Sequence, residues 1–473
     1  MQQLNIYKDN IKVGILYFNS VTNEFELKYT TYWKEVGFPL SPALNFKDNI
    51  NSISIKNFIE NLLPEGDGLE VLSKYFQISK KNKFALIQSI GYETTGAFTF
   101  TISNELPKSS FTQISKKQLS QKIKNRKNES ISLWDGKPRL SVAGVQDKLP
   151  ICYINGEFGF GEGALASTHI LKFDKADEHL VYNEFLSLKL SKIAGLKVNE
   201  VELLKFDDED VLMVERFDRI KLSDKKIQRL HIIDGCQILD QSTNEKYERN
   251  FGSSKDVKDI REGISFKKIF STINLCNSPI EAKLKIIDWI CVNLCIGNVD
   301  AHGKNISYIV SNQGIELSPF YDIVNINLYE QYEQELAMAI DDEFNINKLK
   351  PYDFIEFFNE NNINKTMFLS QFHDISNSII QGLKSPELFN FDIEEDKIEF
   401  FAKYRNNVIN RIKKLKTVMH YINLPANEKE FKKFFNKNRK KIENTIDKEF
   451  LLRHSEASVV EEYFRLMTTL IIK

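Results

Sequence analysis

Residues 297–305, Gly-Asn-Val-Asp-Ala-His-Gly-Lys-Asn, form a short polar segment between two apolar ones. The run 286–296 before it predicts a helix, and the run 306–310 after it predicts a strand. Both flanking runs have the composition of buried structure, so the chain must fold around this loop. Loops held by a buried scaffold are frequent places for chemistry.

Within this loop, Asp300 and Asn305 have the spacing of a phosphotransferase catalytic loop, in which a base Asp precedes a metal-binding Asn. Asp322 adds a second carboxylate at the end of the next apolar run. A base and two oxygen ligands are what Mg²⁺-assisted phosphoryl transfer requires. The same spacing also occurs in ordinary loops, because Asp and Asn both form Asx turns. The motif alone therefore does not decide between the two interpretations.

The length of 473 residues exceeds one ordinary core and predicts two or three subdomains. A net charge of −1 excludes strong global steering toward nucleic acid. The five cysteines have no zinc-site spacing and are expected to be buried thiols of a reducing cytoplasm. We find no signal-peptide pattern and no apolar run near the roughly 18 residues of a membrane span. We expect a cytoplasmic protein that makes no membrane contact.

The first 105 residues alternate strand-like and helix-like patterns and predict a mixed α/β unit. Pro64-Glu65-Gly66 is expected to end a helix over 55–63. Between 106 and 131 Ser, Lys, Asn and Gln dominate. This composition favours a solvated helix and linker over a nucleic-acid-binding patch.

Residues 139–149 place two strand-like segments around a turn of small residues. Small residues let backbone N–H groups approach an anion closely, so this turn is a candidate phosphate loop. The Walker pattern is absent, and an ordinary hairpin remains the simpler interpretation of this segment alone.

Lys172 interrupts the apolar strand predicted over 168–173, and Glu184 lies on the helix predicted next, over 177–194. Kinases pair a strand Lys with a helix Glu in this order to orient the ATP phosphates. A Lys on the exposed side of a strand would give the same pattern.

A second candidate element is the corner at Glu215, Arg216 and Phe217, which follows a continuous apolar strand over 211–214. Such a corner is what a hinge between two lobes would look like, with backbone groups beside an apolar slot for adenine. A local ion pair between Arg216 and Asp218 explains the same residues equally well.

The helix that delivers the Asp300 loop is expected to start with a capping box at 278–281, with Pro279 in its first position. Its apolar face should include Ile280. We interpret His302 as a structural residue that fixes the backbone near the metal. The sequence after 340 predicts helices, and beyond Pro425 it is charged and amphipathic.

Taken together, these segments resemble the HipA family, bacterial serine/threonine kinase toxins of type II toxin–antitoxin systems. The resemblance extends from about residue 4 to residue 420. It is carried by motifs in one order: Leu63-Pro64-Glu65-Gly66, Gly91 and Gly96, then the segments 139–148, 168–172, 214–219, 296–305 and 319–322.

The resemblance implies an α+β, two-lobed, protein-kinase-like fold with an N-terminal mixed α/β subdomain and a mainly helical C-lobe. The implied division is an N-terminal subdomain (1–105), a basic linker or helix (106–131), a kinase N-lobe (132–226), a helical C-lobe (227–424) and a basic helical extension (425–473).

By matching position, the resemblance implies that Asp300 is the catalytic base and that Asn305 and Asp322 hold Mg²⁺. Lys172 would contact the ATP phosphates, and Ser141 would be autophosphorylated, which expels the phosphate loop and switches the kinase off. The other implied nucleotide-site residues are the loop Ala143, Gly144, Val145, Gln146, Asp147 and Lys148, the hinge Glu215, Arg216 and Phe217, and the trio His302, Lys304 and Tyr321.

The implied function is an ATP- and Mg²⁺-dependent protein serine/threonine kinase toxin whose target is a host protein such as an aminoacyl-tRNA synthetase. Its implied partner is a helix-turn-helix antitoxin of the HipB type, which would provide an indirect contact with DNA. Two alternatives remain: a catalytically silent co-repressor, against which the intact Lys172, Asp300, Asn305 and Asp322 argue, and a small-molecule kinase on the same scaffold.

Overall fold

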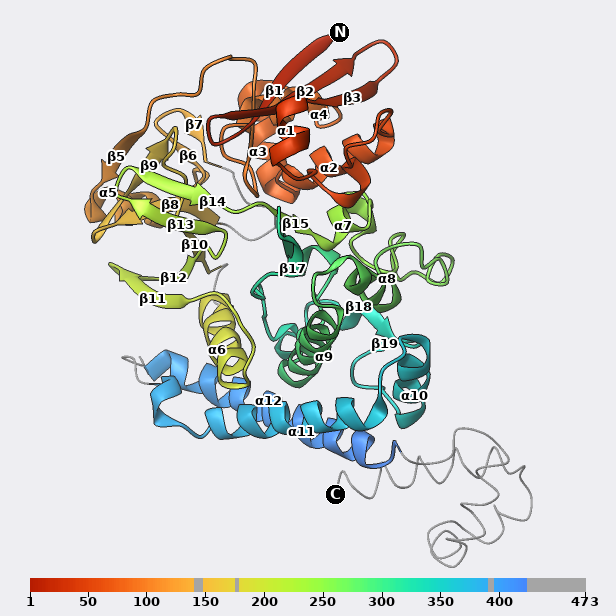
Figure 1. Ribbon diagram of the computed structural model, residues 1–473. Helices are drawn as coiled ribbons and strands as arrows, with labels where there is room; N and C mark the ends of the chain where they lie inside the picture. Colours follow the sequence, from red (N-terminus) through yellow and green to blue (C-terminus); the bar gives the residue numbers. More distant parts are fainter. Residues whose placement is uncertain (140–147, 175–177, 390–394, 423–473) are drawn as a thin grey trace, which may run out of the picture.

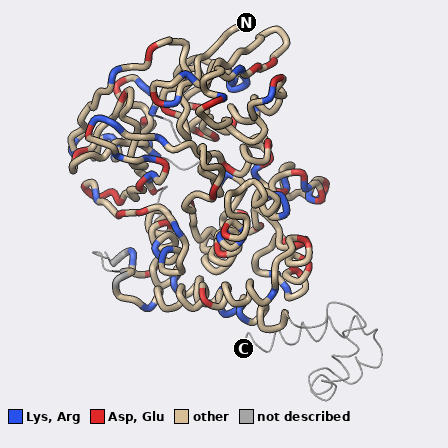
Figure 2. Tube along the Cα trace, in the orientation of Figure 1, with Lys and Arg blue, Asp and Glu red and all other residues tan. Residues whose placement is uncertain are grey.

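The computed structural model describes residues 1–139, 148–174, 178–389 and 395–422 (Figure 1). Ser141, the loop 143–147 and the extension 425–473 lie outside the described residues. The chain forms an N-terminal α/β unit, a second unit built on a larger sheet, and a mainly helical unit that packs beneath both (Figure 1). Basic and acidic residues are interspersed along the trace (Figure 2), in keeping with the net charge of −1.

The N-terminal unit is a four-stranded antiparallel sheet in the order β3-β2-β1-β4, with helices packed on it. Its elements are β1 (Gln2–Lys8), β2 (Ile11–Asn19), β3 (Glu24–Tyr29), β4 (Phe98–Thr101), α1 (Thr31–Val36), α2 (Ser52–Leu62), α3 (Gly66–Phe76) and α4 (Lys83–Ile90). The break expected at Pro64 separates α2 from α3. Gly66 lies there at φ +52°, a conformation that glycine adopts without steric cost.

The second unit is a six-stranded sheet in the order β11-β12-β10-β8-β9-β5. Its elements are β5 (Ser110–Ile114), α5 (Lys116–Lys124), β8 (Lys148–Ile154), β9 (Glu157–Glu162), β10 (His169–Phe173), α6 (Leu180–Ile193), β11 (Val201–Phe206) and β12 (Glu209–Glu215). Two short hairpins accompany it, β6 (Leu133–Trp134) with β7 (Lys137–Pro138) and β13 (Arg219–Ser223) with β14 (Lys226–Arg229).

The segment 106–131 is not a free linker. It supplies β5, the edge strand that pairs with β9, and α5, which packs on β11 and β12. Leu119 and Ile123 of α5 are fully buried in the core beneath this sheet. Lys116, Lys117 and Lys124 lie on the exposed face of this packed amphipathic helix, whereas Arg126, beyond its end, is only 7% exposed on its side chain and pairs with Glu209 at 2.9 Å.

The helical unit surrounds α9 (Pro279–Ile296), which contacts α11 (Lys365–Gly382) and α12 (Glu395–His420). Because α11 also contacts α6, the helical layer supports both the second unit and the loop that follows α9. The remaining elements are α7 (Gly235–Ile238), α8 (Phe266–Ser271), α10 (Pro351–Glu360), β15 (Ile232–Asp234), β16 (Ser307–Ser311), β17 (Gly314–Leu317), β18 (Glu335–Ile340) and β19 (Glu343–Asn345).

The start of α9 differs from the expectation. Pro279 is its first residue, but the Ser278 side chain makes no capping hydrogen bond and Ile280 is 77% exposed. Ser278 has φ −124° and ψ 88°, not the fully extended backbone that aims a cap side chain at the helix. The first turn projects from the core, and the buried face begins at Ala282.

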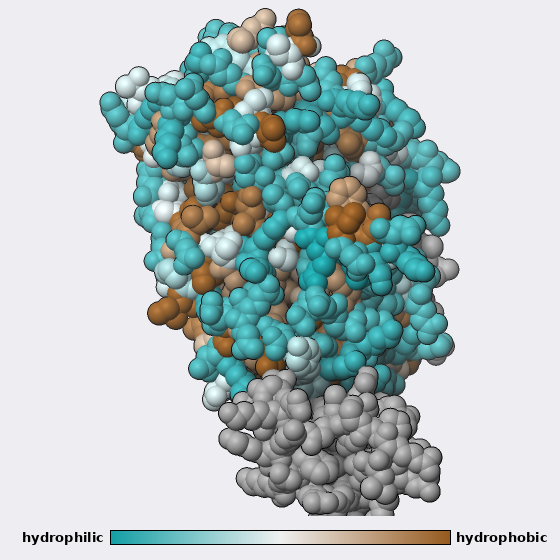
Figure 3. Space-filling view, turned by 90° about the vertical axis from the view of Figure 1, so that its right-hand side faces the viewer, coloured by the Kyte–Doolittle hydropathy of each residue, from teal (hydrophilic) through white to brown (hydrophobic). Residues whose placement is uncertain are grey.

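All five cysteines are buried and free, as expected. None of the helices in the described part of the chain is long and apolar enough to cross a membrane. The face seen in Figure 3 is mostly hydrophilic, with apolar side chains gathered in patches.

Candidate active site

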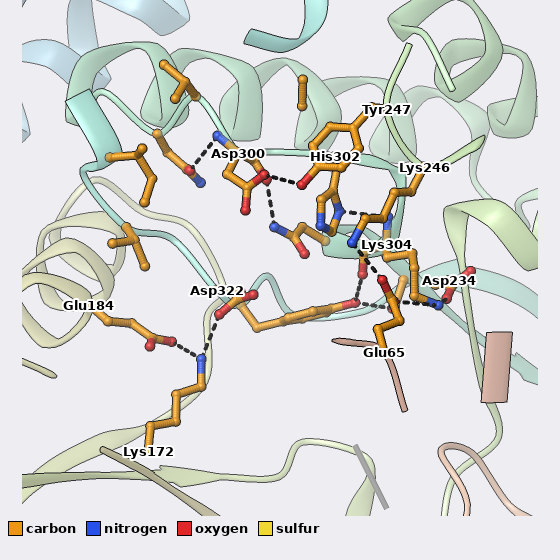
Figure 4. Close-up of a pocket in the computed structure, with 18 of the residues that line it drawn as sticks. Glu65, Lys172, Glu184, Asp234, Lys246, Tyr247, Asp300, His302, Lys304 and Asp322 are labelled. Carbon is orange, nitrogen blue, oxygen red and sulfur yellow. Dashed lines mark hydrogen bonds and ion pairs between the residues drawn. The ribbon is translucent and has the colours of Figure 1, made fainter. Parts of the chain in front are cut away.

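A cavity of about 650 Å³ lies where the three units meet (Figure 4). The N-terminal unit contributes Asn61 and Glu65, the second unit contributes Lys172 from β10, and the helical unit contributes Asp300 and Asp322. A volume of this size is typical of small-molecule sites.

The loop after α9 is held by its own polar side chains. Gly297 ends the helix at φ +91°, and the Asp300 N–H then donates to the Asn298 amide oxygen at 3.2 Å. Asn305 closes the loop, because its amide nitrogen donates to the Asp300 carbonyl at 2.9 Å. The Asp300 carboxylate accepts a hydrogen bond from the Tyr247 hydroxyl at 2.8 Å and lines the cavity.

Lys172 makes the ion pair that the order of strand and helix suggested. Its Nζ lies 2.6 Å from Glu184 Oε1 and 2.6 Å from Asp322 Oδ1. Burial alone would lower the pKa of Lys172, but Asp322 and Glu184 hold it above its ordinary value. The ammonium therefore stays charged, and it joins two units of the fold at the cavity wall.

Asp322 follows a tyrosine that ties the loop after β17 to the Asp300 loop. The Tyr321 hydroxyl donates to the Lys304 carbonyl at 2.7 Å, and its ring stacks on Phe217 with the centroids 5.9 Å apart. Asp322 itself has φ +58°. Burial would raise its pKa, but Lys172 lowers it well below the ordinary range, so the carboxylate is ionised.

The corner after β12 contains the local ion pair that its sequence suggested, and it also borders the cavity as a hinge would. The Arg216 guanidinium is buried against both carboxylate oxygens of Asp218, at 3.0 Å each, so it is a structural ion pair. Phe217 lines the cavity, and no hydrogen bond among the described residues uses its peptide N–H or C=O. The expectation for Glu215 needs correction: it is exposed, does not line the cavity, and its carbonyl accepts from Asn199 at 2.7 Å.

Lys148 is the one residue of the expected phosphate loop that the described part of the chain includes. It begins β8 and lines the cavity. Desolvation lowers its pKa to about 8 despite the nearby Asp322. An added anion in the cavity would therefore favour the charged form of Lys148.

His302 and Lys304 stabilise the Asp300 loop. His302 Nδ1 accepts from the Lys304 N–H at 3.2 Å, and burial lowers the pKa of its ring, which keeps it neutral. The Lys304 ammonium contacts Asp234 Oδ2 at 2.5 Å and Asn61 Oδ1 at 2.9 Å. Both residues line the cavity, but these contacts hold the loop in place.

Sequence reasoning did not identify Lys246 and Tyr247 as site residues, and it noted Glu65 only as part of a motif. Glu65 pairs with Lys246 across 181 positions, and Tyr247 reaches Asp300 across 53. Neither separation leaves a local pattern in the sequence. The motif around Glu65 was the one available signal.

The described residues contain no group of three or more His, Cys, Asp and Glu side chains that could hold a metal ion. Asn305 and Asp322 both line the cavity, and they supply hard oxygen donors of the kind that Mg²⁺ prefers. Two protein ligands suit Mg²⁺, which usually retains several waters and also binds phosphate oxygens.

Residues 4–101 match the family model of the HipA N-terminal domain, and residues 140–383 match that of the HipA-like C-terminal domain. The chain is 41% identical over 410 residues to the serine/threonine-protein kinase toxin HipA of Shewanella oneidensis, which covers 86% of this chain and 94% of that protein. It is 28% identical over 353 residues to the putative kinase Y4mE of Sinorhizobium fredii, covering 71% and 80%. A chain in the solved complex of HipA, HipB and operator DNA from Shewanella oneidensis superposes with a TM-score of 0.83 at 40% identity, covering 89% of this chain and 99% of that one.

Proposed function

The chain belongs to the HipA family of serine/threonine-protein kinases, and from this premise we propose that it uses ATP and Mg²⁺ to phosphorylate a host protein as the toxin of a type II toxin–antitoxin pair. The observation that carries the proposal is the Lys172 ammonium, which bridges Glu184 and Asp322 at 2.6 Å each in the cavity that Asp300 also lines.

The phosphate end of this site would lie at Lys172 and Lys148. A fixed ammonium neutralises phosphate charge without having to reorganise when the nucleotide binds. Phe217, Ile170 and Val214 also line the cavity and would supply the apolar slot for adenine, with the unused peptide groups of Phe217 beside it.

Asn305 and Asp322 are the residues that would hold Mg²⁺. The amide nitrogen of Asn305 already closes the loop by donating to the Asp300 carbonyl. Its amide oxygen is therefore the atom that would bind the ion. Bound there, the ion would supply positive charge to the phosphates. The Asp322 carboxylate would then be shared between the ion and Lys172.

Asp300 would accept the proton of the serine or threonine hydroxyl and orient its oxygen toward the phosphoryl group. Tyr247 occupies only one oxygen of the carboxylate, Oδ1. The second oxygen can accept a hydrogen bond from the serine or threonine hydroxyl of the substrate. Asn298 and Asn305 keep the backbone of the loop in place during the transfer.

The proposal predicts that the purified protein transfers the γ-phosphoryl group of labelled ATP to serine or threonine, in its own chain and in proteins of a lysate, only when Mg²⁺ is present. Phosphoamino-acid analysis and mass spectrometry of both fractions would measure this. Transfer to a small molecule with no protein labelled would support the alternative of a small-molecule kinase. Nucleotide binding without any transfer would support a silent co-repressor.

Ser141 is proposed as the autophosphorylation site that switches the enzyme off. A phosphoserine carries up to about two negative charges. Ser141 lies seven positions before Lys148, and Lys148 lines the cavity at its candidate phosphate end. We therefore expect the Ser141-phosphorylated protein to bind ATP at least about tenfold more weakly, because like charges repel. Calorimetry on the two separated forms would measure this, and equal affinities would rule out the switch.

The proposed partner is a helix-turn-helix antitoxin of the HipB type, with DNA contacted through it. The similar HipA of Shewanella oneidensis was solved together with HipB and operator DNA. The proposed class of target, an aminoacyl-tRNA synthetase, rests on the family resemblance alone.

A further inference from the structure

Glu65 extends from the N-terminal unit into the cavity of the candidate active site. It lies in the short turn between α2, which ends at Leu62, and α3, which begins at Gly66. Its Oε2 is 2.7 Å from Lys246 Nζ, and its Oε1 is 3.9 Å from Lys304 Nζ (Figure 4). The Glu65 and Lys246 side chains are only 17% and 13% exposed, so water screens their attraction less than at an open surface.

Lys246 and Tyr247 form a two-residue segment that contacts the Asp300 loop. The Lys246 carbonyl accepts from the Gly303 N–H at 2.9 Å. Its ammonium lies 5.3 Å from the centroid of the Tyr247 ring, which in turn packs edge-on against His302 at 5.1 Å. The Tyr247 hydroxyl then donates to Asp300 Oδ1. One side of this segment therefore contacts Glu65, and the other side contacts the candidate base.

A second connection runs from the same turn to the same loop. Lys304 Nζ contacts the Asn61 side-chain oxygen at 2.9 Å and the Asn61 carbonyl at 3.3 Å, at the end of α2. Lys304 adjoins Asn305 and is only 5% exposed on its side chain. The N-terminal unit thus fixes the catalytic loop through two lysines, although it supplies no group to the candidate chemistry itself.

These contacts are separate from those of the phosphate end. Figure 4 shows Glu184, Lys172 and Asp322 on one side of the cavity, and Glu65, Lys246 and Asp234 on the other. A change at Glu65 should therefore disturb the placement of Asp300 and leave the contacts of Lys172 intact.

Given the kinase function proposed above, on which this inference rests, we propose that Glu65 is a positioning residue for phosphoryl transfer. Through Lys246 it fixes Tyr247, and through Tyr247 it fixes the Asp300 carboxylate. The N-terminal unit therefore completes the active site and is more than an appended domain.

The test is the rate constant of autophosphorylation at saturating ATP, together with the ATP concentration that gives half the maximal rate. Small misplacements of a reacting group are costly, so Glu65→Gln should lower the rate constant roughly tenfold. The half-saturating ATP concentration should change less than about twofold, because Glu65 makes no ion pair with Lys172 or Asp322, whose contacts with each other and with Glu184 stay in place.

Glu60→Gln is the matched control. Glu60 lies on α2 of the same unit, pairs with Lys83 at 3.7 Å, is 13% exposed on its side chain, and does not line the cavity. It should keep the wild-type rate constant. An equal loss in the two variants would show a general effect on the N-terminal unit and overturn the proposal.

A double-mutant cycle with Tyr247→Phe tests the route. Tyr247 is at the surface, and the substitution removes only a hydroxyl, so this variant should fold. When residues act through the same series of contacts, the effects of substituting them are not additive. The double variant should therefore be no slower than the slower single variant. A loss in the double variant that equals the product of the two single losses would overturn the route through Tyr247. If Glu65→Gln kept the rate constant of the unmodified protein while Asp300→Asn was inactive, this inference alone would be overturned. If the unmodified protein itself showed no transfer, the proposed kinase function would be overturned.

Discussion

Asp300→Asn should abolish phosphoryl transfer by this protein, with a loss of at least roughly 10²–10⁴-fold in rate, the usual contribution of a general base. Asparagine has nearly the same shape, and its Oδ1 can still accept the Tyr247 hydroxyl. The backbone hydrogen bonds of the loop to Asn298 and Asn305 do not involve the changed atoms. The variant therefore removes the proposed proton acceptor and leaves the loop in place.

Transfer of label from ATP, and inhibition of growth when the gene is expressed, are the two measurements. Both should be lost, while the melting temperature and the affinity for ATP stay close to wild type. Asp288→Asn is the control, because Asp288 lies on α9, which delivers the loop, and its carboxylate accepts a hydrogen bond from Gln371 at 2.6 Å, away from the cavity. Transfer that persists in the Asp300 variant would exclude Asp300 as the base.

Some parts of this site could be predicted from the sequence because their geometry is local. Asp300 and Asn305 lie in one nine-residue loop between a buried helix and a buried strand. Lys172 and Glu184 lie on consecutive elements, so the order of strand and helix was enough to suggest their ion pair. The assignment of the family rested on several such local motifs in one order.

Other parts could not be predicted, because they depend on how the units pack. Nothing in the neighbourhood of Glu65 shows that it will meet Lys246, and nothing around Tyr247 shows that it will reach Asp300. Glu215 illustrates the opposite error. The motif includes it, but Glu215 does not line the cavity. Its N–H donates to the Glu200 carbonyl at 2.9 Å and its carbonyl accepts from Asn199 at 2.7 Å, so its peptide groups are already used within the fold.

Composition was a weak guide wherever an element is half-buried. Segment 106–131 has many lysines, yet Leu119 and Ile123 of α5 are buried in the core of the second sheet. A few apolar residues at helical spacing are enough to hold such a helix on a sheet, whatever the polar face contains.

The second large effect is expected at Asp322. A substitution there should change the proposed metal binding without a large loss in the free energy of unfolding. Asp322→Asn removes one of the two carboxylates at Lys172, but Glu184, only 2% exposed on its side chain, still neutralises the ammonium. We therefore expect the variant to fold. By contrast, Lys172→Met would leave Glu184 buried without a counter-charge, at a cost of about 3–5 kcal/mol in the free energy of unfolding.

Titration of ATP into each protein, with Mg²⁺ and then with excess chelator, measures the role of Asp322. The wild type should bind at least about tenfold more tightly with Mg²⁺, because a cation held by Asn305 and Asp322 would also contact the phosphates. In Asp322→Asn the two affinities should converge, and transfer should fall to background. Glu333→Gln is the control, since Glu333 also lines the cavity but its carboxylate is hydrogen-bonded to the Ser253 hydroxyl at 2.9 Å. If the Asp322 variant kept the full Mg²⁺ dependence, the cation would have to bind elsewhere, and the pairing of Asp322 with Lys172 would be structural.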